Sequence, residues 1–179
     1  MPDEPFAESL AMLKTAEGQN NAVFACVGSA LQHAQRFEAE VAGLLLACAR
    51  LGAKPLSVAE LDSLDKKLQR QTLGTLLTRW STQANIDDNS YAKLLTDALQ
   101  SRNFLVHRYF LERGTELAEE AGRLRLLQEL VAIPTQFEEA TTLVRAITIV
   151  LNQVSDGTRP IDTGGDAPFT ITIATPDHH

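Results

Sequence analysis

Cysteine is nearly absent from this chain, with only two among 179 residues. Cys26 and Cys48 lie far apart and outside any Cys-x-x-Cys motif, which argues against a cysteine-based metal site. Both lie in apolar patterns with helical spacing. We therefore expect them to be small core residues in a reducing compartment, without a disulfide.

Long apolar runs are absent as well. No stretch approaches the roughly 18 apolar residues that a membrane-spanning helix requires, and no basic segment followed by an apolar segment opens the chain as a signal peptide. We therefore expect a soluble, cytoplasmic protein that makes no contact with a membrane.

Aromatic residues and positive charge are also scarce. Aromatics make up 6% of the chain against 44% hydrophobic residues, a composition typical of aliphatic helices rather than of a β-sandwich. The net charge of −7 argues against a general nucleic-acid coat, but a small pocket for one phosphodiester needs only a few cations. One candidate group of cations is Lys66, Lys67, Arg70 and Arg79; the alternative is a solvated helix face.

Apolar residues recur at helical spacing through most of the chain. Gly52 and Pro55 end the first long pattern, and Ser57 with Glu60 forms a capping box before the second. The predicted helices cover residues 5–16, 20–51, 57–80 with a bend at Gly74, 91–113, and 116–154 with an interruption near Pro134. This pattern predicts an all-α bundle of four to five helices.

After Ser155 the chain becomes rich in glycine and proline. Within it, Phe169, Ile171 and Ile173 alternate with threonines as in a β-strand. A single short strand is not stable alone, so it docks on its own domain, pairs with a second copy, or forms a loose arm. We therefore expect a helical domain of residues 1–154 and an irregular tail of residues 155–179 that contains one short strand.

The most informative stretch places three functional groups on about one and a half turns of the helix expected over residues 91–113: Arg102, Asn103 and His107. A guanidinium can hold a phosphate, and an imidazole exchanges a proton near neutral pH. Arg102 also falls in an apolar stripe, so the alternative is a buried structural arginine paired with acids or helix carbonyls. His107 has the corresponding alternative of a structural histidine.

This helix has a second apolar surface. Asn103 and His107 are four residues apart and therefore neighbours on one face, where Phe104 and Leu111 flank His107. A helix with two apolar surfaces can bury one in its own bundle and the other against a partner chain. The alternative is a central helix that its own domain surrounds.

The spacing Arg102-Asn103-x-x-x-His107 resembles the motif of the HEPN superfamily (higher eukaryotes and prokaryotes nucleotide-binding). In that motif a polar residue follows the arginine, and a histidine lies four to six positions after the arginine. Residues 72–76, 109–110, 122–123 and 127–130 also look like segments of small bacterial HEPN proteins. The resemblance covers residues 20–154 in helix order and implies a HEPN-like helical bundle.

The resemblance implies a homodimer that brings two motifs together, and a metal-independent endoribonuclease without a cofactor. RNA is then the substrate, the role is that of a toxin or phage-defence effector, and an antitoxin or regulatory protein is a partner. His107 would exchange protons with the 2′-hydroxyl or the 5′-oxygen, Arg102 would hold the phosphate, and Asn103 would orient these groups. No carboxylate cluster or His/Cys ligand spacing indicates a metal.

Two other hypotheses stay open at this point. One is a non-catalytic HEPN-like module that binds a nucleotide or a protein. The other is a purely structural helical protein in which Arg102 and His107 satisfy each other or nearby acids.

The charges that follow the motif are also ambiguous. Several glutamates would repel RNA if they flanked a cleft, and four arginines either offset them or form exposed i,i+4 ion pairs. The glutamates are Glu112, Glu116, Glu119 and Glu120, and the arginines are Arg108, Arg113, Arg123 and Arg125.

Overall fold

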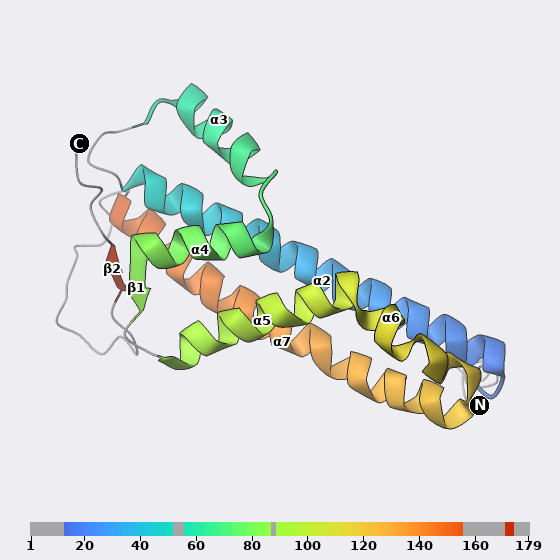
Figure 1. Ribbon diagram of the computed structural model, residues 1–179. Coiled ribbons are helices and arrows are strands. Elements are labelled where there is room, and N and C mark those ends of the chain that lie inside the picture. Colours follow the sequence, from blue (N-terminus) through green and yellow to red (C-terminus); the bar gives the residue numbers. More distant parts are fainter. Residues whose placement is uncertain (1–12, 52–55, 87–88, 156–170, 174–179) are drawn as a thin grey trace, which may run out of the picture. The chain divides into compact units, whose positions relative to one another are not determined.

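The computed structural model describes residues 13–51, 56–86, 89–155 and 171–173. Most of these residues lie in helices, which confirms the predicted all-α class (Figure 1). The elements are α2 (Ala16–Arg50), α3 (Val58–Leu68), α4 (Leu73–Gln83), β1 (Ala84–Ile86), α5 (Asn89–His107), α6 (Tyr109–Arg113), the 3-10 helix η1 (Gly114–Ala118), α7 (Glu120–Ser155) and β2 (Ile171–Ile173). The helix expected over residues 5–16 falls mostly outside the described residues.

The predicted capping box starts α3. The Ser57 amide donates to Glu60 Oε2 at 2.8 Å, and the Glu60 amide donates to Ser57 Oγ at 3.4 Å. The hydrogen bonds that the Ser57 side chain and backbone donate lower the pKa of the Glu60 carboxyl. The cap therefore begins the helix where the sequence pattern places it.

The single helix with a bend at Gly74 is a wrong prediction. The chain leaves the helix after Leu68, and a new helix, α4, begins at Leu73. Thr72 Oγ1 accepts a hydrogen bond from the Thr75 amide at 3.3 Å, so a threonine caps the start of α4. A second N-cap inside one apolar pattern divides that pattern into two helices.

The sequence predicts a kink or a split of the last helix at Pro134, and the split is wrong, because α7 continues through this residue as one element. Proline removes one backbone hydrogen bond, which normally weakens a helix interior. Leu130 and Phe137 lie about one turn to either side of Pro134, and both are completely buried. Tertiary packing on both sides therefore outweighs the lost bond.

The chain divides into two compact units, and α2, α5 and α7 contribute residues to both. The motif unit has described residues 13–34 and 100–137, and the scaffold unit has the rest of the described residues from 35 to 99 and from 138 onward. Buried side chains of the motif unit include Val23, Val27, Ala30, Leu105, Tyr109, Leu126, Leu130 and Phe137. Those of the scaffold unit include Phe37, Val41, Leu44, Leu68, Leu73, Leu76, Trp80, Leu95, Val144 and Ile147. The expected division into residues 1–154 and 155–179 stays a prediction.

The scaffold unit contains a short ladder of two antiparallel strands. β1 pairs with β2 so that Ala84 lies opposite Ile173 and Ile86 opposite Ile171. In the same unit, Arg145 of α7 donates to Glu40 of α2, with Nε 2.7 Å from Oε1. The alternating Ile and Thr residues of the tail thus pair with a segment of their own chain.

The two cysteines are free thiols, and the expectation that both are core residues holds for Cys48 but is wrong for Cys26, which is half-buried. Cys48 is buried, and burial raises the pKa of its thiol to about 11. In the described parts of the chain, no helix is long and apolar enough to cross a membrane.

Candidate functional site

The continuous helix predicted over residues 91–113 is wrong, and the difference lies at the motif. α5 ends at His107, the next residue has φ −128° and ψ −23°, and α6 begins at Tyr109. After the break Tyr109 enters the core and is 1% exposed, whereas Arg108 stays on the surface. His107 is therefore the last residue of a helix and not a residue of a helix interior.

Contacts within the motif unit hold this helix end in place. Ser101 Oγ donates to Gln136 Oε1 of α7 at 2.7 Å. The rings of Phe104 and Tyr109 meet edge to face with centroids 5.6 Å apart, and the Phe110 ring contacts Phe24 of α2 at a tilt of 46°, also with centroids 5.6 Å apart. These contacts attach the turns on both sides of His107 to α7 and α2.

The three motif residues differ in exposure. Asn103 and His107 are exposed, and Arg102 is half-buried. Arg102 Nη1 lies 3.3 Å from Asn103 Oδ1, so the guanidinium donates to the amide. A buried structural histidine is therefore excluded for His107. Asn103 and His107 are one turn apart on α5 and both side chains reach solvent.

Several large apolar side chains of this unit are exposed, and three of them lie within four residues of His107 in the sequence. The predicted stripe is buried at Leu105 and Tyr109, but Val106 is 47% exposed. We define the apolar group as the four exposed apolar residues of α2, α5 and α6 in this unit: Phe24, Val106, Phe110 and Leu111. Their exposed fractions are 51%, 47%, 41% and 87%, in that order.

A close backbone contact holds η1 against the start of α7. A Cβ atom at Gly122 would lie 2.1 Å from the carbonyl oxygen of Glu116, which is far closer than real Cβ contacts. Only a glycine permits this approach. Next to it, Arg123 Nη1 donates to the Leu117 carbonyl at 2.8 Å, which places a cation at the carbonyl end of η1.

The hydroxyl of Tyr109 is buried and has no hydrogen-bond partner among the described residues. Burial is the main cause that raises the pKa of this phenol well above its usual range, and the nearby Glu129 carboxylate adds to it. The hydroxyl is therefore neutral and serves no polar contact within the unit.

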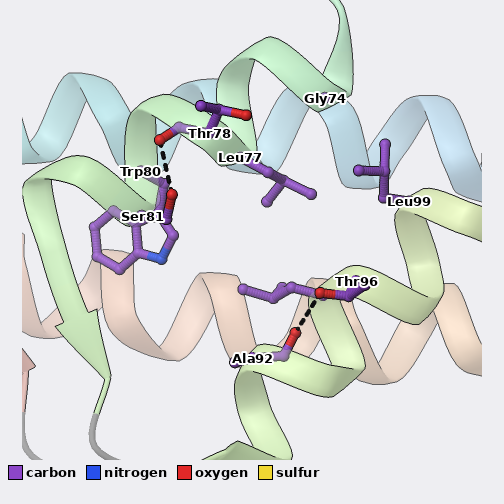
Figure 2. A pocket seen from close by; sticks show the side chains of 9 residues that line it. Gly74, Leu77, Thr78, Trp80, Ser81, Ala92, Thr96 and Leu99 are labelled. Carbon is purple, nitrogen blue, oxygen red and sulfur yellow. Dashed lines mark hydrogen bonds between the residues drawn. The ribbon is translucent and has the colours of Figure 1, made fainter.

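The described residues contain no group of three His, Cys, Asp or Glu side chains that could hold a metal ion. A groove of about 290 Å³ lies in the scaffold unit between α4 and α5 (Figure 2). Its lining has no charged side chain, and the Ser81 and Thr96 hydroxyls already donate to carbonyls of their own helices at 2.8 and 2.9 Å. The groove is therefore unsuited to a phosphate.

The candidate cations of the scaffold unit fit the solvated-face interpretation. Lys66 and Lys67 are exposed in the last turn of α3, where positive charge stabilises the carbonyl end of a helix. Arg70 is exposed in the following turn, and Arg79 is half-buried on α4.

No protein-family model, curated protein or solved structure matches this sequence. The HEPN resemblance therefore stays a prediction that depends on the motif and its setting.

Proposed function

We propose that this protein is a homodimeric, metal-independent endoribonuclease of the HEPN kind, with its site at Arg102, Asn103 and His107. The observation that carries the proposal is the exposure of His107 at the end of α5, with Asn103 exposed one turn before it. An imidazole that reaches solvent can exchange protons with a bound substrate.

The residue types suit cleavage through the RNA 2′-hydroxyl. Neutral His107 takes the proton of that hydroxyl, and the oxygen attacks phosphorus. The bond from phosphorus to the 5′-oxygen breaks, and a protonated imidazole gives that oxygen its proton. Arg102 stabilises the negative charge of the pentacoordinate transition state, and Asn103 orients the phosphate or the arginine. The products are a 2′,3′-cyclic phosphate and a free 5′-hydroxyl.

The apolar group supports the homodimer. Leu111 is 87% exposed, and Phe24 and Phe110 lie in ring contact while each keeps more than a third of its surface in solvent. Such residues beside a functional motif are typical of a surface that a partner covers. Pairing of two identical surfaces there would bring two copies of His107 together, and two copies would supply both the base and the acid.

The resemblance extends the proposal to a role as a toxin or phage-defence effector, with an antitoxin or regulatory protein as partner. The second candidate function is a non-catalytic HEPN-like module that binds a nucleotide or a protein. The apolar group and the net charge of −7 favour it, because both suit a protein partner better than RNA.

The test is cleavage of a labelled oligoribonucleotide by nuclease-free protein in the presence of EDTA. We expect the wild type to cut and His107→Ala to lose at least about a hundredfold in rate, as loss of a general acid–base does. His33→Ala is the matched control, because His33 also lies in the motif unit and its Nδ1 donates to the Ser29 carbonyl, 2.8 Å away. Equal rates for wild type and His107→Ala would contradict the proposal, and binding of a nucleotide without cleavage would support the second candidate.

A further inference from the structure

Four arginines follow the motif within 18 residues of His107, and the sequence alone does not tell which of them face a ligand. They are Arg108, Arg113, Arg123 and Arg125. Their contacts within the motif unit show which guanidiniums stabilise the structure and which are accessible to a ligand.

Arg123 stabilises the structure of the motif unit. It is only 7% exposed, and its Nε donates to Gln19 Oε1 of α2 at 2.7 Å while Nη1 donates to the Leu117 carbonyl. Movement of this guanidinium toward a ligand would leave a buried amide oxygen and the end of η1 without a donor. The Arg123 guanidinium therefore has a structural role and is not accessible to a ligand.

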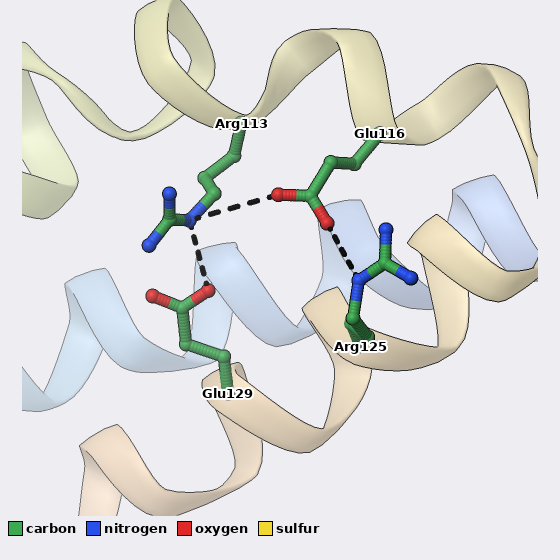
Figure 3. A network of polar contacts seen from close by, with 4 residues as sticks. All are labelled: Arg113, Glu116, Arg125 and Glu129. Carbon is green, nitrogen blue, oxygen red and sulfur yellow. Dashed lines mark hydrogen bonds and ion pairs between the residues drawn. The ribbon is translucent and has the colours of Figure 1, made fainter.

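Arg113 and Arg125 belong to one network of ion pairs (Figure 3). Arg113 Nε lies 3.2 Å from Glu129 Oε2 and 3.9 Å from Glu116 Oε1, and Arg125 Nε lies 3.1 Å from Glu116 Oε2. The network joins α6, η1 and α7, and the Arg113 guanidinium also lies 5.9 Å above the Phe104 ring. Arg113 thus contacts two carboxylates and a ring, whereas Arg125 contacts Glu116, a carboxylate that Arg113 also approaches.

Arg108 lies outside the network of Figure 3, although it is about as exposed as Arg125, whose side chain is 62% exposed. The Arg108 side chain is 69% exposed, and it forms an ion pair with Glu112, four residues later, at 2.5 Å. An exposed i,i+4 pair of this kind contributes little to stability. A phosphate can accept two charge-assisted hydrogen bonds from one guanidinium, so it competes well with a lone exposed carboxylate.

We infer that Arg108 binds the RNA backbone at the phosphate next to the one that His107 would cleave. In the free protein the Arg108 guanidinium is ion-paired with Glu112. The inference rests on the proposed ribonuclease function. Arg108 directly follows His107 at the break between α5 and α6, so the cation and the imidazole leave the backbone at neighbouring positions. When RNA binds, its phosphate replaces the Glu112 carboxylate as the partner of Arg108.

The experiment measures binding of a fluorescent 2′-O-methyl oligoribonucleotide, which lacks the nucleophile, over a series of salt concentrations. We expect Arg108→Ala to weaken binding about tenfold and to reduce the slope of log K against log salt by about one, as loss of one phosphate contact does. We expect Glu112→Gln to tighten binding severalfold, because it removes the competing carboxylate. Lys14→Ala is the matched control, since Lys14 is an exposed cation of the same unit, and it should change binding less than twofold.

The outcomes separate this inference from the proposed function. If Arg108→Ala and Lys14→Ala bind alike, or if the wild type does not bind the oligomer, the inference is wrong, whatever the cleavage assay shows. If binding depends on Arg108 and Glu112 but His107→Ala cuts RNA as fast as wild type, the proposed catalysis fails and the assignment of Arg108 stands.

Discussion

The scaffold unit and the motif unit bury different kinds of side chain. In the scaffold unit the buried side chains are mainly apolar and include Phe37, Trp80 and Ile147, with Thr141 as a buried polar residue. The motif unit has an apolar core as well, but it also buries Gln19 and Arg123, which are hydrogen-bonded to each other. It also keeps His107, Asn103 and the apolar group in solvent. The comparison teaches that the motif unit adds buried polar contacts to its apolar core, whereas the scaffold unit depends mainly on apolar burial.

The largest expected effect tests the apolar core of the scaffold unit. Trp80 is 3% exposed, so Trp80→Ala should lower the free energy of unfolding by about 3–5 kcal/mol. Val58→Ala is the control, because Val58 is 76% exposed on α3 and its truncation should cost less than about 0.5 kcal/mol. Urea unfolding followed by circular dichroism measures both, and similar losses for the two variants would contradict the described core.

A second change tests the close backbone contact of the motif unit. Gly122→Ala forces a methyl group against the Glu116 carbonyl oxygen and should cost about 1–3 kcal/mol, as overpacking does. Gly28→Ala is the matched control on α2, where a Cβ meets no atom within 4 Å. Alanine is the better helix former, so the control should gain up to about 1 kcal/mol. Changes of the same sign in both variants, measured by urea unfolding, would show that η1 does not lie this close to α7.

The smallest effect concerns the unpaired hydroxyl. Tyr109→Phe removes a buried polar group without a partner, so it should raise the free energy of unfolding by about 1 kcal/mol at neutral pH. The raised pKa of Tyr109 in the folded state means that only the unfolded chain loses this proton just above its ordinary pKa of about 10. Stability should therefore fall as the pH rises above about 10, and Tyr109→Phe should lack part of that fall.

Unfolding curves between pH 8 and 11 measure this dependence. Tyr91→Phe is the control, because Tyr91 is the other tyrosine of the chain and its replacement keeps Tyr109. If the free energy of unfolding of Tyr109→Phe fell more steeply above pH 10 than that of the wild type, the burial of the Tyr109 hydroxyl would be wrong.

Much of the fold follows from local patterns in the sequence. The spacing of Val23, Val27 and Phe37 predicts α2, and Ser57 with Glu60 predicts the start of α3. These features depend on residues within one turn of each other. The continuity of α7 through Pro134 does not, because it depends on packing that only the folded chain supplies.

The candidate site is predictable in its residues but not in its setting. Arg102, Asn103 and His107 follow from the motif, whereas the break at Arg108 follows from the burial of Tyr109 against Phe104. A helical periodicity cannot reveal one non-helical residue between two helical turns. The hydrogen bonds of Arg113 to Glu129 and of Arg123 to Gln19 also join positions 16 and 104 residues apart, which no spacing rule predicts.

The most direct test of the central claim is the chemistry of the cut. RNA and a matched oligomer with a 2′-deoxy sugar at each cleavage position are incubated with the protein and EDTA, and the product ends are identified by mass spectrometry. The account predicts 2′,3′-cyclic phosphate ends from RNA, no cut in the deoxy oligomer, and no such products with His107→Ala. Equal cleavage of the deoxy oligomer, or unchanged products with His107→Ala, would contradict it.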